Sequence, residues 1–169
     1  YLPWDDMEEL MRERHIPLYT LESKTAVSEM NILAITIPYE SLYTNVLNLL
    51  DLAGIPVHST DRDSTHPLVI AGGHSTFNPE PMSAFIDAFV IGEGEEVFPE
   101  IIAVYQAWKK QNSTRMDLLT QLAKIEGVYV PVFYEPRYNP DGTLAETIPL
   151  NDQVPSRIKK RILPVLPSP

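Results

Sequence analysis

The strongest constraint on the fold comes from three short apolar runs, each closed by a proline or by glycines. The runs are residues 31–37 (NILAITI), 67–71 (PLVIA) and 88–91 (AFVI), followed by Pro38, Gly72-Gly73 and Gly92. Runs of this length that contain β-branched residues are typical of strands buried on both faces of a parallel sheet. We therefore expect three core strands.

Helical periodicity lies between and after these runs. Residues 41–53 place Leu42, Val46, Leu49, Leu50 and Ala53 on one helix face, and Gly54 follows where glycine commonly ends a helix. Further helices are expected at about 5–14, 97–110 and 114–125, with weaker strand signals at 16–21 and 55–58. Strands that alternate with helices predict parallel βαβ units, and hence a flavodoxin- or Rossmann-like, doubly wound, mostly parallel α/β sheet.

The pattern changes after Gly127. Residues 128–135 and 144–150 flank the turn sequence 139–142 (NPDG), which predicts a β-hairpin. The expected organisation is an α/β domain at 1–127, a hairpin extension at 128–150 and a proline-rich linker at 151–169. Because the chain opens without Met and closes on prolines, we expect it to be a segment of a longer protein.

Charge and cysteine content exclude several functions. The 169 residues carry a formal net charge of −10 and contain no cysteine. The negative charge argues against a nucleic-acid partner, because phosphate neutralisation needs many Lys and Arg side chains. The absence of cysteine excludes disulfides, thiol catalysis, thiolate zinc sites and iron–sulfur ligation by this chain. No apolar run approaches the roughly 20 residues of a membrane helix and no signal peptide is visible, so we expect a cytoplasmic location.

The candidate binding residues follow the three predicted strands, because ligands of open parallel sheets bind at the carboxyl ends of strands. They are Thr36, Tyr39, Glu40, Ser41, Gly72, Gly73, His74, Ser75, Gly92, Glu93, Gly94 and Glu95. Two alternatives remain open for the glycines: close approach of a ligand to the backbone, or the geometry of a tight turn. Ser41 can equally cap the following helix.

The acidic run at 92–96 (GEGEE) would repel a phosphate, although its carboxylates suit a helix N-terminus. It can therefore bind ribose hydroxyls, amides or another domain, or simply begin a helix. We expect no catalytic residue and no metal site, because His15, His58, His66 and His74 show no paired ligand spacing, and only His74 is placed to meet a ligand. The basic cluster at 157–161 either faces solvent or contacts a following domain.

Several of these segments together resemble the N-terminal region of cobalamin-binding-type radical SAM proteins. The matching segments are Tyr39-Glu40, 43–48 (YTNVLN), 50–56 (LDLAGIP), 68–73 (LVIAGG), 78–81 (NPEP) and 85–96 (FIDAFVIGEGEE), within a resemblance spanning about residues 1–160. The resemblance implies a flavodoxin-like domain that precedes a barrel, in which three cysteines hold a [4Fe–4S] cluster with S-adenosylmethionine. Cluster and radical chemistry would then belong to a domain beyond Pro169.

The better-known cobalamin domains carry three cofactor-facing loops, and the resemblance places two of them here, near 36–41 and at Gly72-Gly73. The first, an Asp-x-His-x-x-Gly loop with the axial histidine, would precede Tyr1, so we expect the first strand of the domain to be missing. Two hypotheses follow. The chain is a cofactor-binding accessory domain that holds the corrin or its nucleotide tail, or it is a degenerate domain that docks in cis on the radical SAM barrel without cobalamin.

Overall fold

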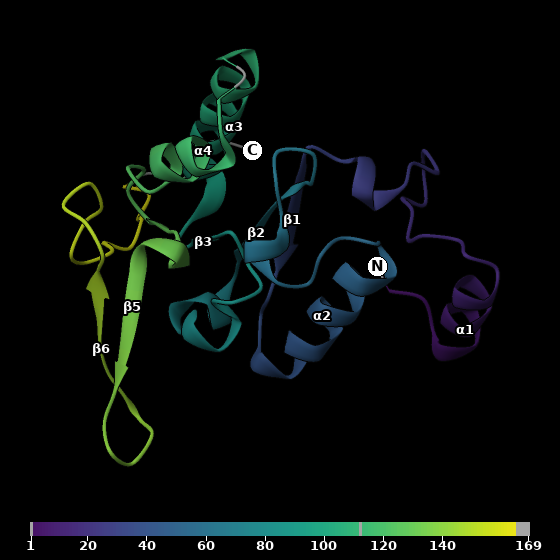
Figure 1. Ribbon diagram of the computed structural model, residues 1–169, viewed down its shortest axis with the longest axis horizontal. Helices are drawn as coiled ribbons and strands as arrows, with labels where there is room; N and C mark the ends of the chain where they lie inside the picture. Colours follow the sequence, from purple (N-terminus) through teal and green to yellow (C-terminus); the bar gives the residue numbers. More distant parts are fainter. Residues whose placement is uncertain (1, 112, 165–169) are drawn as a thin grey trace.

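A four-stranded sheet forms the centre of the fold, with its strands in the order β1-β2-β3-β4 (Figure 1). The computed structural model describes residues 2–111 and 113–164. Strands β1 (Ile32–Thr36), β2 (Leu68–Gly72) and β3 (Ala88–Val90) are parallel, and β4 (Val128–Tyr129) joins β3 antiparallel. The expected mostly parallel α/β sheet is confirmed.

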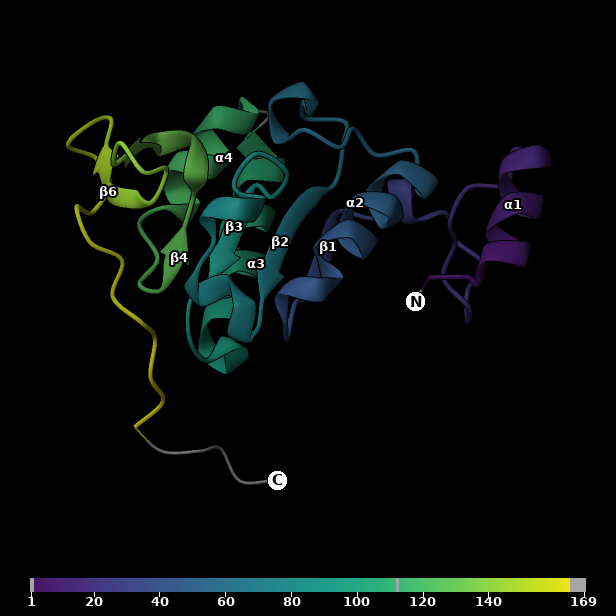
Figure 2. The same cartoon turned by 90° about the horizontal axis from the view of Figure 1, so that it is seen from below.

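Helices α2 (Tyr43–Leu52) and α3 (Gly94–Gln111) pack on opposite faces of this sheet. On β1, Leu33 lines a cavity with Leu49 of α2, whereas Ala34 lines another with Phe98 of α3. Successive side chains of a strand point to opposite faces, so the two helices cover different sides. The view from below shows α2 and α3 separated by the strands (Figure 2).

The predicted helices are confirmed, with small shifts at their ends. Helix α1 (Asp5–Glu13) lies on the side of α2 away from the strands (Figure 1) and contacts α2 through a salt bridge between Arg12 and Asp51, and α4 (Arg115–Leu122) follows α3. Gly54 has φ of +69°, as expected of a glycine that ends a helix. Helix α3 begins three residues earlier than expected, at Gly94, so it takes in part of the acidic run. No helix in the described ranges 2–111 and 113–164 is long and apolar enough to cross a membrane.

Strand β1 differs from the prediction that it is buried on both faces. It lies at the edge of the sheet, where Ala34 and Thr36 are exposed, whereas β2 and β3 are almost fully buried. The weaker strand signals were also wrong. Within 16–21 only Tyr19 forms a bridge, to Ala26, and 55–58 is an irregular connection to a 3-10 turn. Apolar composition favours strands but does not determine which segments pair.

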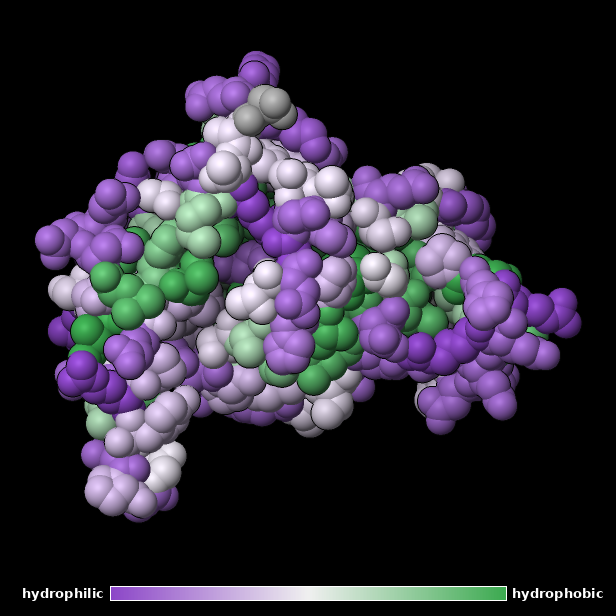
Figure 3. Space-filling model, in the orientation of Figure 1, coloured by the Kyte–Doolittle hydropathy of each residue, from purple (hydrophilic) through white to green (hydrophobic). Residues whose placement is uncertain are grey.

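The predicted hairpin is present as β5 (Tyr134–Tyr138) and β6 (Leu144–Pro149), which form a separate antiparallel ribbon. The single strand expected over 128–135 is divided into β4 and β5. A 3-10 turn at Pro131–Phe133 separates them, and Pro131 has no N–H to continue a ladder. The space-filling view shows apolar surface at the base of the hairpin (Figure 3), where Val132 and Leu150 are exposed.

Candidate functional site

A cavity of about 360 Å³ lies between the carboxyl ends of β1–β3 and the first turn of α3. We call it the strand-end cavity. Six of the twelve sequence-predicted binding residues line it: Thr36, Gly72, Gly73, Gly92, Gly94 and Glu95. Parallel strands end at one edge of a sheet, so three loops that are far apart in sequence meet here.

Two of these glycines are not required by the geometry of the chain. A Cβ on Gly72 would meet the Cβ of Val90 at an ordinary 3.9 Å, and a Cβ on Gly94 would have no described atom within 4 Å. Neither residue has a positive φ. A methyl group at either position would therefore be tolerated by the fold, although both residues line the strand-end cavity.

The other two glycines, Gly73 and Gly92, are required by the structure of the chain itself. Gly73 has φ of +108°, and a Cβ there would come within 2.7 Å of the carbonyl oxygen of Ile37. Its loop is held by Thr76, whose buried hydroxyl lies 2.7 Å from the Gly73 carbonyl oxygen and 3.1 Å from that of Val90. The tight-turn explanation therefore accounts for Gly73, and close backbone packing accounts for Gly92, as described below.

The polar and aromatic lining of the strand-end cavity is sparse. Thr36 and Glu95 are exposed and offer a hydroxyl and a carboxylate, and Phe98, which is 38% exposed, contributes an aromatic ring. The remaining walls are backbone and small aliphatic side chains. This combination suits a flat ring with hydroxyl groups, because the glycines leave room for a ring and the carboxylate accepts hydrogen bonds.

The remaining predicted residues do not line this cavity. Tyr39, Glu40 and Ser41 are exposed on or beside the 3-10 turn Glu40–Leu42, and His74 is exposed on a 3-10 turn beside Phe77. Ser41 does not cap α2, because the N-cap position is held by Leu42. Ser75 is buried next to the Tyr43 hydroxyl, whose pKa is raised by burial. Glu93 instead accepts a hydrogen bond from the Leu163 N–H.

Residues 158–164, the C-terminal segment, run across the end of β3. The Arg161 N–H donates to the Ile91 carbonyl at 2.9 Å, and the Glu93 N–H donates to the Arg161 carbonyl at 3.1 Å. A Cβ on Gly92 would overlap that carbonyl oxygen and lie 2.8 Å from the Arg161 nitrogen. Gly92 is therefore a glycine because another stretch of backbone passes against it.

Acidic side chains hold the same segment electrostatically. The Arg161 guanidinium lies 3.1 Å from a Glu96 carboxylate oxygen and 2.5 Å from one of Glu100, and the Leu163 N–H donates to the Glu93 carboxylate. Sequence reasoning missed this pairing. The signal was present, because an acidic run at 93–100 and a basic cluster at 157–161 have opposite charge, but nothing local indicates that they meet.

Comparison with protein families adds a match over residues 1–131 to the family described as radical SAM proteins, N-terminal. The chain belongs to this family. Neither the curated proteins nor the solved structures gave a significant match. Membership implies an iron–sulfur cluster and S-adenosylmethionine in the parent protein, and this radical SAM N-terminal domain is an accessory part of it. Cluster ligation falls outside the chain, which has no cysteine.

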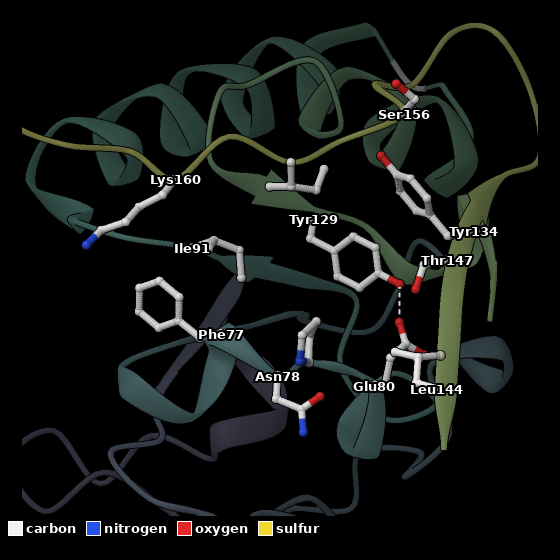
Figure 4. Close-up of a pocket in the computed structure, with 12 residues that line it drawn as sticks. Phe77, Asn78, Glu80, Ile91, Tyr129, Tyr134, Leu144, Thr147, Ser156 and Lys160 are labelled. Carbon is white, nitrogen blue, oxygen red and sulfur yellow. Dashed lines mark hydrogen bonds between the residues drawn. The ribbon is translucent and has the colours of Figure 1, made fainter. Parts of the chain in front are cut away.

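A second cavity of this N-terminal domain, about 420 Å³, lies between the hairpin, β4 and the loop after β2 (Figure 4). Sequence reasoning did not anticipate it, since it draws on segments from Phe77 to Lys160. The Tyr129 hydroxyl donates a hydrogen bond to the Glu80 carboxylate at 2.6 Å. Burial raises the pKa of Tyr129 strongly, and the neighbouring carboxylate raises it further. Burial also raises the pKa of Tyr134 to about 12, so both phenols remain protonated at neutral pH.

Metal binding finds no support in the arrangement of side chains. Among the described residues of the domain, no three His, Asp or Glu side chains are grouped so as to hold a metal ion. The Lys160 ammonium, which lies 5.3 Å from the centre of the Phe77 ring, contributes a cation at the rim of the second cavity. The strand-end cavity is the site that best combines glycines that leave the backbone accessible with side chains that can form hydrogen bonds, namely Thr36 and Glu95.

Proposed function

We propose that this domain is the cofactor-holding module of a radical SAM enzyme, and that its strand-end cavity receives the nucleotide tail of a cobalamin-type cofactor. The observation that carries the proposal is the pair Gly72 and Gly94. Both line the cavity, and neither is needed for backbone conformation or for packing against a neighbouring atom. Glycine at such positions serves a close approach by something outside the chain.

The residues present fit the heterocycle and ribose of the tail. A volume of about 360 Å³ lies within the range of small-molecule pockets. Phe98 offers a face for stacking, and Thr36 and Glu95 offer hydrogen bonds to ribose hydroxyls. The carboxylates at the mouth disfavour a phosphate inside the cavity, which leaves the neutral parts of the tail as its occupants.

The role of this chain is therefore binding and orientation. No histidine is among the described residues that line the cavity, so these residues do not supply a lower ligand to cobalt. When bound, a cobalamin would supply organometallic cobalt chemistry. Thr36, Gly72, Gly94, Glu95 and Phe98 would fix the position of its tail relative to the following domain.

Titration of the 169-residue chain with the riboside of 5,6-dimethylbenzimidazole, the nucleoside of the cobalamin tail, tests this proposal by calorimetry. Gly94→Leu places a side chain in the cavity, whereas Gly94→Ala adds only a methyl group at the same position. We expect Gly94→Leu to weaken binding at least about tenfold, Gly94→Ala to change it less than about threefold, and both to keep the native unfolding temperature. Equal affinity of all three proteins, or no binding by the native chain, would overturn the proposal.

A second candidate function is docking on the following domain without a cofactor. The observation that favours it is the C-terminal segment, whose Arg161 is held by Glu96 and Glu100 so that the chain leaves the domain at a fixed point. Under this alternative, the double variant Glu96→Lys, Glu100→Lys weakens association with the following domain of the parent protein. Pull-down of that domain measures the loss, and riboside binding in the same variant separates the two functions, because neither residue lines the strand-end cavity.

A further inference from the structure

The second cavity, of about 420 Å³, is a candidate binding site in its own right, because it shares no residue with the strand-end cavity. Glu80 and Lys160 are the only formally charged side chains among the described residues that line it. Its apolar wall consists of aromatic and aliphatic side chains, namely Phe77, Ile91, Tyr129, Tyr134, Leu144 and Ile158. One negative and one positive group therefore line the same largely apolar cavity.

The Glu80 carboxylate is fixed in place, but only one of its oxygens is used by the protein. Glu80 begins the 3-10 turn Glu80–Met82, and its Oε1 accepts the hydrogen bond from Tyr129. The other oxygen, Oε2, accepts no hydrogen bond from the described residues and is not buried. No basic side chain among these residues forms an ion pair with Glu80 either. Oε2 is therefore an accessible, negatively charged acceptor.

Lys160 supplies the opposite charge at the rim of the same cavity. Its ammonium lies 5.3 Å from the centre of the Phe77 ring, which is close enough for a cation–π attraction. The side chain is exposed, and among the described residues it forms no ion pair. Figure 4 shows Glu80 and Lys160 on opposite sides of the cavity, with Ile91 and Tyr129 between them. The two charges thus do not neutralise each other directly.

We infer that the second cavity binds an ω-amino acid, a molecule that carries an ammonium group and a carboxylate at opposite ends of a short methylene chain. The ligand ammonium donates to Glu80 Oε2, and the ligand carboxylate accepts from the Lys160 ammonium. The methylene chain lies against the apolar wall between them, where its burial is favourable. Each part of the ligand then meets a complementary part of the cavity.

The arrangement of the two charges disfavours other small ligands. An α-amino acid carries its charges on adjacent atoms, so it pairs with only one of two groups that lie on opposite sides of the cavity. A simple cation or anion also pairs with only one group, and the other group repels it. A metal ion lacks ligands here, because Glu80 is the only carboxylate among the described lining residues.

Titration of the isotope-labelled 169-residue chain with 6-aminohexanoate, followed by NMR at constant ionic strength, tests this inference. We expect a dissociation constant of about 1 mM, which is reasonable for a ligand of about nine non-hydrogen atoms. The isomer 2-aminohexanoate has the same atoms but adjacent charges, and it should bind at least about fivefold more weakly. Hexanoate and hexylamine each lack one of the two charges and should also bind at least about fivefold more weakly.

A matched pair of lysine variants assigns the binding to this cavity. Lys159 precedes Lys160 in the sequence but does not line the cavity, and its 82% exposed side chain pairs with Glu126. Lys160→Gln and Lys159→Gln each remove one positive charge from an exposed position, so both variants keep the core unchanged. At low ionic strength, Lys160→Gln should weaken 6-aminohexanoate binding about threefold, because exposed ion pairs are weak, and Lys159→Gln should change it less than about 1.5-fold.

A third variant tests the other end of the ligand. Glu80→Gln keeps an oxygen that can accept the Tyr129 hydrogen bond but removes the negative charge. We expect it to unfold near the native temperature and to bind 6-aminohexanoate about tenfold more weakly. The inference is overturned if the native chain does not bind 6-aminohexanoate, if 2-aminohexanoate binds equally well, if the two lysine variants bind alike, or if folded Glu80→Gln binds like the native chain.

Discussion

Replacing Gly92 with alanine should detach the C-terminal segment without unfolding the domain. Gly92 has φ of +107°, and its Cβ position overlaps the Arg161 carbonyl oxygen. Because the end of β3 is buried in the sheet and the C-terminal segment is not, the segment is the part that moves. Its release breaks the hydrogen bonds between Arg161 and Ile91 and between Glu93 and Arg161, together with the ion pairs of Arg161.

The contacts that hold the segment are individually weak. Two backbone hydrogen bonds contribute about 1 kcal/mol each. The ion pairs contribute about 0.5 kcal/mol each, because Glu96 and Glu100 are 52% and 43% exposed. An alanine at a positive φ adds about 1–3 kcal/mol of strain, enough to shift the equilibrium toward the detached state.

Hydrogen exchange of the backbone amides measures the detachment directly. In Gly92→Ala, we expect the Arg161 and Glu93 amides to exchange at least about tenfold faster, while the urea unfolding free energy of the sheet changes by less than about 1 kcal/mol. Gly94→Ala is the matched control, since its Cβ meets no described atom, and it should exchange like the native protein. Native protection of Arg161 in Gly92→Ala would refute the reasoning.

Three further predictions concern stability. Asp87→Ala leaves two buried guanidinium groups, those of Arg62 and Arg115, without their carboxylate and should lower the urea unfolding free energy by about 3–5 kcal/mol. A loss below about 1 kcal/mol would show that the backbone carbonyls around the two guanidinium groups are enough to stabilise them. The pKa of Tyr134 is raised from 10.0 to about 12 in the folded state. The stabilisation that comes from keeping this phenol neutral is therefore fully present below pH 10 and is lost as the pH rises toward 12. Tyr134→Phe should make that fall smaller in urea titrations at several pH values. Thr114→Ala removes the capping box that Thr114 forms with Asp117 and should lower the unfolding free energy by about 1 kcal/mol. Thr65→Ala is the comparison, because it removes a similar hydrogen bond between an exposed threonine and Asp63 that does not cap a helix.

Much of the secondary structure was predictable because its signals are local. The periodicity of residues 41–53 and the glycine that follows them depend only on neighbours in sequence, and α2 with Gly54 was found where expected. The same holds for β2, β3 and the hairpin turn at 139–142. The sequence also indicated that loops after three strands would meet, because parallel strands end at one edge.

The composition of the strand-end cavity was only half predictable. Thr36, Gly72 and Gly94 were identified by position after a strand, but the same rule also selected His74 and Ser41, which lie elsewhere. Position after a strand indicates the correct edge of the sheet. It does not indicate which way a loop turns, because that depends on contacts such as the bonds from Thr76 to the Gly73 and Val90 carbonyls.

The sequence by itself determined that this is a cysteine-free α/β domain with three parallel strands, a hairpin and open glycine loops at the strand ends. Only the tertiary structure decided that β1 is an edge strand, that Gly92 faces Arg161 while Gly94 faces a cavity, and that Arg62 and Arg115 share one carboxylate. The physical reason is how far apart in the sequence the interacting residues lie. Helix periodicity and turn chemistry act between residues a few positions apart, whereas these contacts join residues between 25 and about 70 positions apart and arise only when the whole chain packs.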